Sequence, residues 1–358
     1  MINFFLKKQE PVAIDISDFS IELLQINKSR KVLAFNRIIL EPGIVRNGEI
    51  LNEDRLKLKI KELISSTRPR PLDLKENLKI LLSIPDSKTF SFLLETKKGL
   101  FQKQLEEKLM ERIKNIVPLE PGKFYYDFMF LDSDYGNSQM LLCAVVPKNI
   151  IDKYIKIFKD LKLGLILADL ESSSLGRALI LNGNSVLIDI GIRTTNVSFF
   201  DADKNFRSSV TIPIGGNDFT LAVAEKLNVS YADAEKFKRE VGLKDKKTNK
   251  ISGALDIVFG ELTKKIEESI DYFEKRYGTE IIEIILAGGS SLVPFLQDSL
   301  SKITKIAIKT PDPFDKLANK SIFKTMRGSI FFANVVGLSL RGTGDISKGI
   351  NFLKKIKK

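Results

Sequence analysis

The chain lacks histidine entirely and has a single cysteine, Cys143, among its 358 residues. Without histidine, Ser-His-Asp catalysis, Cys-His nucleophiles and histidine-ligated metal sites are excluded. The lone cysteine lies in the apolar run 140–146, which predicts a small buried side chain and no disulfide framework. No apolar run approaches the roughly 18 residues of a transmembrane helix, and Lys7 and Lys8 stand where a signal peptide needs its apolar core. We therefore expect a cytoplasmic protein.

The length and the charge set further bounds. A chain of this length predicts two or more domains. The net charge is +12, and residues 348–358 hold five lysines between apolar side chains. This pattern favours an anionic membrane surface over nucleic acid as a partner, because no recognition-helix motif, aromatic RNA-binding signature or zinc spacing accompanies it. A solvated basic tail is the alternative.

The most informative stretch is residues 186–200, V-L-I-D-I-G-I-R-T-T-N-V-S-F-F. An apolar run ends at Asp189, Gly191 allows a turn, and Thr194 and Thr195 precede a second apolar strand, which predicts a β-hairpin with a polar tip. Such a tip suits a nucleotide phosphate, and a carboxylate at a strand end can hold Mg²⁺ through water. An ordinary hairpin whose aspartate fixes the turn is the alternative.

Two further stretches repeat or extend this plan. Residues 12–24 contain an apolar run, Asp15, a small polar tip and a returning strand, and residues 281–291 form a β-branched run that ends in Gly-Gly-Ser-Ser before an apolar-periodic helix at 295–303. Hairpin, repeated hairpin and late A-G-G-S resemble the phosphate-1, phosphate-2 and adenosine motifs of the actin, Hsp70 and sugar-kinase superfamily. The resemblance implies duplicated α/β domains that close around ATP.

Between the two hairpins lies a strand-helix-strand-strand-helix pattern, residues 82–166, which predicts a module inserted into the first domain. An insertion here resembles FtsA and, more closely, the PilM family, the cytoplasmic actin-like proteins of type IV pilus assembly. The strings that carry the resemblance are 43–50 (G-I-V-R-N-G-E-I), 83–85 (S-I-P), 116–119 (I-V-P-L), 212–220 (I-P-I-G-G-N-D-F-T) and 234–238 (A-E-K-F-K).

The resemblance implies an α/β, actin-like ATPase fold with two ribonuclease-H-like domains. The expected boundaries are 1–81 for the first part of domain 1, 82–166 for an inserted FtsA-type (1C-type) α+β subdomain, 167–185 and 318–345 for the rest of domain 1, 186–317 for domain 2, and 346–358 for a basic tail.

It also implies a set of site residues for ATP and Mg²⁺. Asp15 and Asp189 would lie on opposite sides of the Mg²⁺-nucleotide and hold the metal through water. Glu171 would orient the attacking water, with a plain helix-start carboxylate as the alternative. The residues expected to touch the nucleotide are Ser17 and Ser20 in the first loop, Gly191, Thr194 and Thr195 at the phosphates, Gly215 and Gly216 before a helix, Gly288, Gly289 and Ser290 at the adenosine, and Glu235 and Lys238 at the ribose or adenine edge.

The first phosphate loop departs from the family pattern. Where relatives read D-I-G-S-S-S-x-K, this chain reads D-I-S-D-F-S-I-E at residues 15–22. Asp18 and Glu22 therefore bring negative charge to a place where a lysine would meet phosphate, and like charges at short range disfavour binding or slow hydrolysis. We expect nucleotide binding with weak or absent hydrolysis.

The function implied is a nucleotide-binding scaffold of pilus assembly, peripheral to the cytoplasmic membrane. Its partner would be the N-terminal cytoplasmic peptide of an inner-membrane platform protein, held in a groove between the insertion and the first domain, while ATP sets domain closure. A type II secretion homologue, an FtsA-like membrane tether and a sugar-kinase-type enzyme are the alternatives. Residues 350–353 (I-N-F-L) and 2–6 (I-N-F-F-L) are similar to the I-N-L-L motif of the family's membrane partners, which suggests autoinhibition or self-association through the tail.

Overall fold

The computed structural model describes residues 9–135, 137–244, 249–323, 328–354 and 356. The chain divides into two units, described here one at a time. Unit 1 comprises Met1–Ala178, Pro313–Arg327 and Phe332–Lys358, and unit 2 comprises Leu179–Asp312 and Gly328–Phe331. The motif Ile-Asn-Phe at positions 2–4 lies outside the described residues.

Unit 1 is built on a mixed sheet with the strand order β10-β6-β1-β2-β3. Its strands are β1 (Val12–Ile16), β2 (Ser20–Ile26), β3 (Val32–Ile39), β6 (Lys79–Ile84) and β10 (Gly164–Leu170). β1, β2 and β3 form an antiparallel meander, whereas β6 runs parallel to both β1 and β10. A two-stranded hairpin, β4 (Val45–Arg46) with β5 (Glu49–Ile50), follows the meander.

Helices cover this sheet. The first helix is α1 (Glu53–Ser65), whose N-cap Asn52 accepts a hydrogen bond from the backbone N–H of Arg55 at 3.0 Å. The other helices of this unit are α3 (Lys148–Asp160), α4 (Glu171–Leu179) and α9 (Ala333–Thr343). α9 lies against β1, β2 and β6 and is buried along most of its length.

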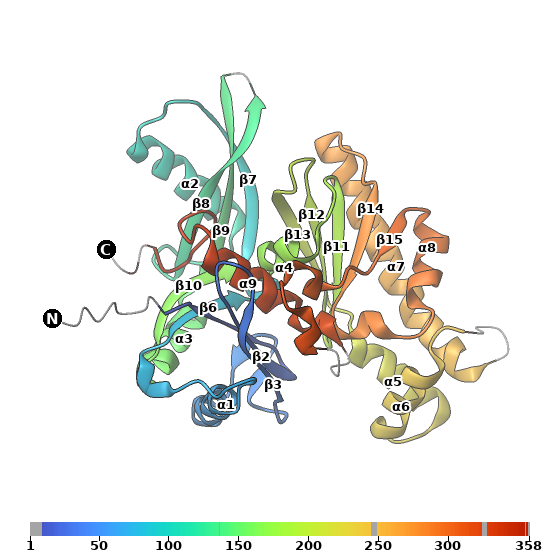
Figure 1. Cartoon of the computed structure of the whole chain (residues 1–358). Coiled ribbons are helices and arrows are strands. Elements are labelled where there is room, and N and C mark those ends of the chain that lie inside the picture. Colours follow the sequence, from blue (N-terminus) through green and yellow to red (C-terminus); the bar gives the residue numbers. More distant parts are fainter. Residues whose placement is uncertain (1–8, 136, 245–248, 324–327, 355, 357–358) are drawn as a thin grey trace. The chain divides into compact units, whose positions relative to one another are not determined.

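The inserted segment forms its own small sheet, with the strand order β7-β9-β8. Its strands are β7 (Phe90–Lys97), β8 (Phe124–Tyr135) and β9 (Ser138–Pro147), and α2 (Gln102–Ile116) packs on one face (Figure 1). Leu105, Leu109 and Ile113 of α2 share a core with Phe92 and Cys143. The prediction that Cys143 is a buried apolar side chain is confirmed.

Unit 2 repeats the plan of unit 1. Its sheet has the order β13-β12-β11-β14-β15, with an antiparallel meander followed by strands parallel to β11, which matches β3-β2-β1-β6-β10 position for position. Its strands are β11 (Ser185–Ile190), β12 (Thr195–Phe200), β13 (Phe206–Ile212), β14 (Glu283–Ala287) and β15 (Ala307–Lys309). Its helices are α5 (Gly216–Leu227), α6 (Tyr231–Val241), α7 (Lys250–Tyr277) and α8 (Leu296–Thr304). The expected duplicated α/β fold is confirmed.

The end of the chain returns to unit 1. After α9, residues 344–348 are mostly exposed, but Ile350, Phe352 and Leu353 are only 1%, 1% and 2% exposed. Part of the expected basic tail therefore belongs to the folded body of unit 1.

Candidate functional site

In unit 2, the predicted phosphate hairpin forms between β11 and β12. Asp189 lies opposite Asn196, and the Gly191 N–H donates to the Thr194 carbonyl at 2.9 Å, which closes the tip. Because β14 runs parallel beside β11, Asp189 also lies next to Ala287. The carboxyl ends of β11 and β14 thus meet at one edge of the sheet, the edge where α/β folds bind ligands.

The predicted adenosine turn lies against that hairpin. Gly288 has φ +80°, and a side-chain carbon there would collide with the Asp189 carboxylate and the Ile190 carbonyl. Ser290 donates from its hydroxyl to the Gly191 carbonyl at 3.0 Å. The structure therefore brings Asp189, Gly191, Gly288 and Ser290 together, with only glycine tolerated at position 288.

The N-terminus of α5 joins the same cluster. The backbone N–H of Gly216 donates to the Gly191 carbonyl at 2.9 Å, and a side-chain carbon at Gly215 would lie 2.7 Å from the backbone of Arg193. Gly215 and Gly216 thus hold the helix against the hairpin tip. Thr195 is buried, and its hydroxyl donates to the Ile214 carbonyl at 2.8 Å, so this side chain braces the hairpin.

Glu235 and Lys238 form a clamp between α5 and α6. The Lys238 ammonium lies 2.6 Å from Glu235, 2.9 Å from the Gly216 carbonyl and 2.8 Å from the Thr220 hydroxyl. These partners match the three donors of an ammonium group. Burial opposes the charge of Glu235, but hydrogen bonds from Lys238, Thr220 and Arg239 outweigh it and lower its pKa. Burial lowers the pKa of Lys238.

In unit 1, Asp15 stands at the end of β1 beside Ser83 of β6. The Ser83 hydroxyl donates to Asp15 Oδ1 at 2.8 Å, and Asn334 of α9 donates to the Ser83 hydroxyl at 2.8 Å. Burial raises the pKa of Asp15, against the opposing effect of these hydrogen bonds. The buried Asn334 Oδ1 has no hydrogen-bond partner within the described chain, which leaves an oxygen acceptor near the carboxylate.

The two serines of the first loop are both bonded within it. The Ser17 hydroxyl accepts from the backbone N–H of Ser20 at 3.0 Å, and the Ser20 hydroxyl donates to Glu22 at 2.6 Å. Asp18 accepts from the backbone N–H groups of Asn47 at 2.9 Å and Gly48 at 3.2 Å, so it ties the loop to the β4–β5 turn.

Glu22 is buried opposite Asp15 in the β1–β2 register. Arg37 of β3 donates from Nε to Glu22 at 2.7 Å. Burial and the charge of Asp15 together raise the pKa of Glu22 to about 7, despite the hydrogen bonds from Ser20 and the charge of Arg37. The negative charge expected here is therefore both paired and partly titrated near neutral pH, an arrangement the sequence alone does not reveal.

Glu171 is the first residue of α4, and its carboxylate accepts from the backbone N–H of Asp86 at 3.2 Å. Asp86 in turn accepts from the hydroxyl of Ser172. This reciprocal arrangement caps the helix. Tyr154 of α3 lies close by: burial, followed by the charges of Asp15, Asp18 and Glu171, raises its pKa.

Three side chains near Asp15 were missed by the sequence reasoning. Tyr154 has a buried hydroxyl with no hydrogen-bond partner among the residues described. Asn334 and Arg37 come from α9 and β3, far from Asp15 in the sequence. Tyr154 sits at an apolar-periodic helix position, and no motif marks the other two, so only the fold brings them to the site.

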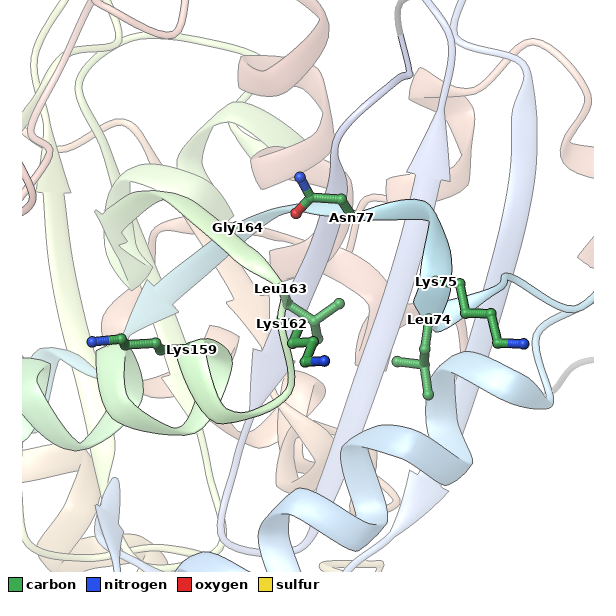
Figure 2. Close-up of a pocket in the computed structure, with 7 residues that line it drawn as sticks. All are labelled: Leu74, Lys75, Asn77, Lys159, Lys162, Leu163 and Gly164. Atoms are coloured by element: carbon green, nitrogen blue, oxygen red, sulfur yellow. The ribbon is translucent and has the colours of Figure 1, made fainter.

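A separate cavity of about 500 Å³ lies at the start of β10 and the end of α3 (Figure 2). Lys75, Lys159 and Lys162 are exposed at its rim. None of the predicted site residues lines it, and no aspartate or glutamate does. The charged side chains that line it are therefore all positive.

A family model described as type IV pilus assembly protein PilM matches residues 13–343. The chain belongs to the PilM family. The family assignment agrees with the motifs described above and makes this a type IV pilus assembly protein. No curated protein matches the chain. Within the described residues, none of the helices combines the length and apolarity needed to cross a membrane.

Solved structures support the same fold. The structure of a PilM–PilN type IV pilus biogenesis complex is 19% identical, has a TM-score of 0.79, and covers 94% of this chain and 99% of that chain. Ethanolamine utilization protein EutJ from Carboxydothermus hydrogenoformans is 14% identical with a TM-score of 0.58 over 93% of this chain and 89% of that one. MreB5 of Spiroplasma citri bound to ADP is 13% identical with a TM-score of 0.55 over 96% and 99%.

Proposed function

We propose that this PilM-family protein is a nucleotide-binding scaffold whose unit 1 binds the short cytoplasmic tail of an inner-membrane pilus protein, with ATP setting domain closure. The observation that carries the proposal is the family match over residues 13–343 combined with similarity to a PilM–PilN complex. On this proposal the protein lies at the inner face of the membrane because its partner is anchored there.

The nucleotide part rests on the geometry of each unit. In unit 2, Gly191, Gly288 and Ser290 are partly exposed and pack together beside Asp189. In unit 1, Asp15 and the unpartnered Asn334 Oδ1 are oxygen donors of the kind that Mg²⁺ prefers. Within the described chain no cluster of three acidic, cysteine or histidine groups could hold a metal alone, which fits an ion that arrives with the phosphates and keeps its waters.

Hydrolysis is proposed to be slow. Glu171, the residue expected to orient the attacking water, already accepts a hydrogen bond from the backbone of Asp86. Asp18 in the first loop and Glu22 on β2 are both acids, and neither can supply the positive charge that stabilises developing negative charge on a phosphate.

Titration with a fluorescent ATP analogue in the presence of Mg²⁺ tests the nucleotide part. Asp189→Ala should weaken binding at least tenfold, because it removes the carboxylate beside the hairpin tip. Asp203→Ala, an exposed aspartate in the β12–β13 turn, is the matched control and should bind as the original chain does. Equal affinity of both variants, or no binding at millimolar nucleotide, would remove the nucleotide claim.

Binding of the partner is tested with synthetic N-terminal tails of the inner-membrane proteins encoded beside this chain. Fluorescence anisotropy should detect one of these tails binding, and a scrambled tail of equal composition should not bind. If none of the tails binds to the protein, with or without ATP, the scaffold proposal is contradicted.

An FtsA-like membrane tether is less well supported. Such a tether needs an exposed amphipathic helix, yet Ile350, Phe352 and Leu353 are buried in unit 1. The apolar side chains that would enter the membrane are thus already covered by the protein.

A further inference from the structure

The C-terminal segment, residues 350–353, lies between two sheet edges of unit 1. β10 is the last strand of the main sheet, and β8 is the last strand of the small sheet. The segment bonds to both: to β10 through Ala168 and to β8 through Asp127. Sheet edges carry unpaired backbone groups and are the usual places where an extended peptide adds to a protein.

Asn351 makes most of the specific contacts. Its Oδ1 accepts from the Ala168 N–H at 3.1 Å, and its Nδ2 donates to the Ile166 carbonyl at 3.4 Å. The pairing of β10 with β6 skips Ile166, which leaves this carbonyl for the asparagine. An amide side chain has both a donor and an acceptor, so it satisfies the two backbone groups as another strand would.

The backbone of the segment completes the fit. The Phe352 N–H donates to the Ala168 carbonyl at 3.0 Å, and the Asn351 N–H donates to Asp127 Oδ2 at 2.8 Å. Lys354 forms an ion pair with the same Asp127 oxygen at 2.8 Å. We call the surface formed by Asp127, Ile166 and Ala168 the edge surface. The edge surface therefore favours a peptide that has an asparagine between apolar residues and a lysine or arginine after them.

The segment is joined to the body by a short exposed linker. Residues 344–348 are mostly exposed, and Gly349 has φ +94°. Arg341 at the end of α9 pairs with Asp169 at 2.7 Å and donates to the Ile350 carbonyl at 2.6 Å. The buried contacts thus start at Ile350, and the segment is held as a peptide ligand on a tether.

We propose that the C-terminal segment is a built-in competitor, which occupies the edge surface and must leave it before the membrane partner's tail can bind unit 1. The inference rests on the proposed function. A tail that displaces the segment should also present an amide side chain, because an apolar residue at this position leaves the Ala168 N–H and the Ile166 carbonyl without hydrogen-bond partners. Binding of the tail then releases residues 350–353 from unit 1.

The expected size of this competition follows from the tether. A short linker gives an effective concentration in the millimolar range. If the segment has an intrinsic dissociation constant of about 10 μM, it lowers the apparent affinity for the tail roughly 100-fold. Weakening the segment should restore that affinity.

A full-length Asn351→Ala, Phe352→Ala variant tests the competition. The first probe is a peptide of residues 347–358, which should bind the variant at least tenfold more tightly than it binds the original chain. The same peptide with alanine in place of its asparagine should bind neither. Lys348→Ala, an exposed change in the linker, is the control and should behave as the original chain.

The original chain provides a second measurement that does not depend on the variant folding. Hydrogen exchange at the backbone amides of Asn351 and Phe352, both donors in the structure, should accelerate when the partner's tail is added at saturation. The tail should also bind the variant at least tenfold more tightly than the original chain.

The outcomes separate this inference from the proposed function. A tail that binds both proteins equally and leaves exchange at residues 351 and 352 unchanged overturns the inference and leaves the scaffold function standing. If the 347–358 peptide binds the variant but neither protein binds a tail, the proposed function is overturned. The membrane partner's tail is then also excluded as the ligand of the edge surface. A variant that dimerises until residues 1–8 are removed would identify a second copy of this chain as the occupant, which also overturns the inference.

Discussion

Arg37 on β3 and Glu22 on β2 form an ion pair with 2.7 Å between Nε and Oε1, directly across the sheet from Asp15. The pair places a cation from the neighbouring strand β3 beside the hairpin formed by β1 and β2. Because Glu22 is buried beside a second carboxylate, its pKa rises to about 7 in spite of Arg37. The hairpin therefore changes charge near neutral pH.

Replacing Glu22 with glutamine should remove a pH dependence of stability. An acid whose pKa rises from 4.5 to about 7 on folding stabilises the fold fully below pH 4.5, and that contribution is lost as pH rises through 7. Between pH 4.5 and 8 the original chain should lose about 3 kcal/mol relative to Glu22→Gln. Urea unfolding across this range measures the difference. Parallel curves for the two proteins would contradict a titration of Glu22 in this range.

Gly288→Ala should destabilise unit 2. The backbone at φ +80° is strained for any other residue, and the added carbon would collide with the Ile190 carbonyl. We expect a loss of more than about 2 kcal/mol in the free energy of unfolding. Gly260→Ala on α7 is the control: its added carbon meets no atom within 4 Å, and a helical site should gain about 0.5–1 kcal/mol. Equal unfolding midpoints for the two variants would contradict the close packing of the turn on β11.

The strand pattern and the duplicated hairpins were predictable because they depend on local periodicity. The strand before Asp189 and the turn at Gly288 each carry a signal within a few neighbouring residues. The family assignment follows from the same local strings. These local signals do not predict which distant residues each side chain contacts.

The partners of the site residues come from distant segments. Arg37 neutralises Glu22 only because β2 and β3 pair, and Asn334 reaches Ser83 only because α9 crosses β6. The same limit applies to Lys238, for which the sequence suggests a nucleotide contact and the structure provides three protein acceptors. The site in the structure differs from the site predicted from the sequence because of long-range packing, which no motif in the sequence encodes.

Lysines at the cavity rim should contribute to binding of anionic membranes. Lys75, Lys159 and Lys162 form no ion pair in the part of the chain that the structure describes, and three such charges near a membrane contribute about 3 kcal/mol in total. Changing all three to glutamine should weaken binding to phosphatidylserine vesicles roughly 100-fold at low salt. The control with the same loss of charge changes three exposed lysines of unit 2, Lys226, Lys236 and Lys264. Equal losses for both triple variants would show that net charge alone governs the attraction.

Lys238→Met should destabilise the protein in the absence of any nucleotide. The change removes the buried ammonium that donates to Glu235, the Gly216 carbonyl and the Thr220 hydroxyl, while methionine keeps most of the buried apolar volume. Glu235 keeps its hydrogen bonds from Thr220 and Arg239. We expect the free energy of unfolding to fall by about 2–3 kcal/mol.

The control on the same helix is Lys236→Met, which changes an exposed lysine and should stay within about 0.5 kcal/mol of the original chain. Urea unfolding of both variants, with and without Mg²⁺-ATP, separates a clamp from a nucleotide contact. A clamp lowers stability equally under both conditions. If Lys238→Met unfolds normally without nucleotide and loses only the stabilisation that ATP adds, Lys238 contacts the ligand and the α5–α6 clamp is secondary.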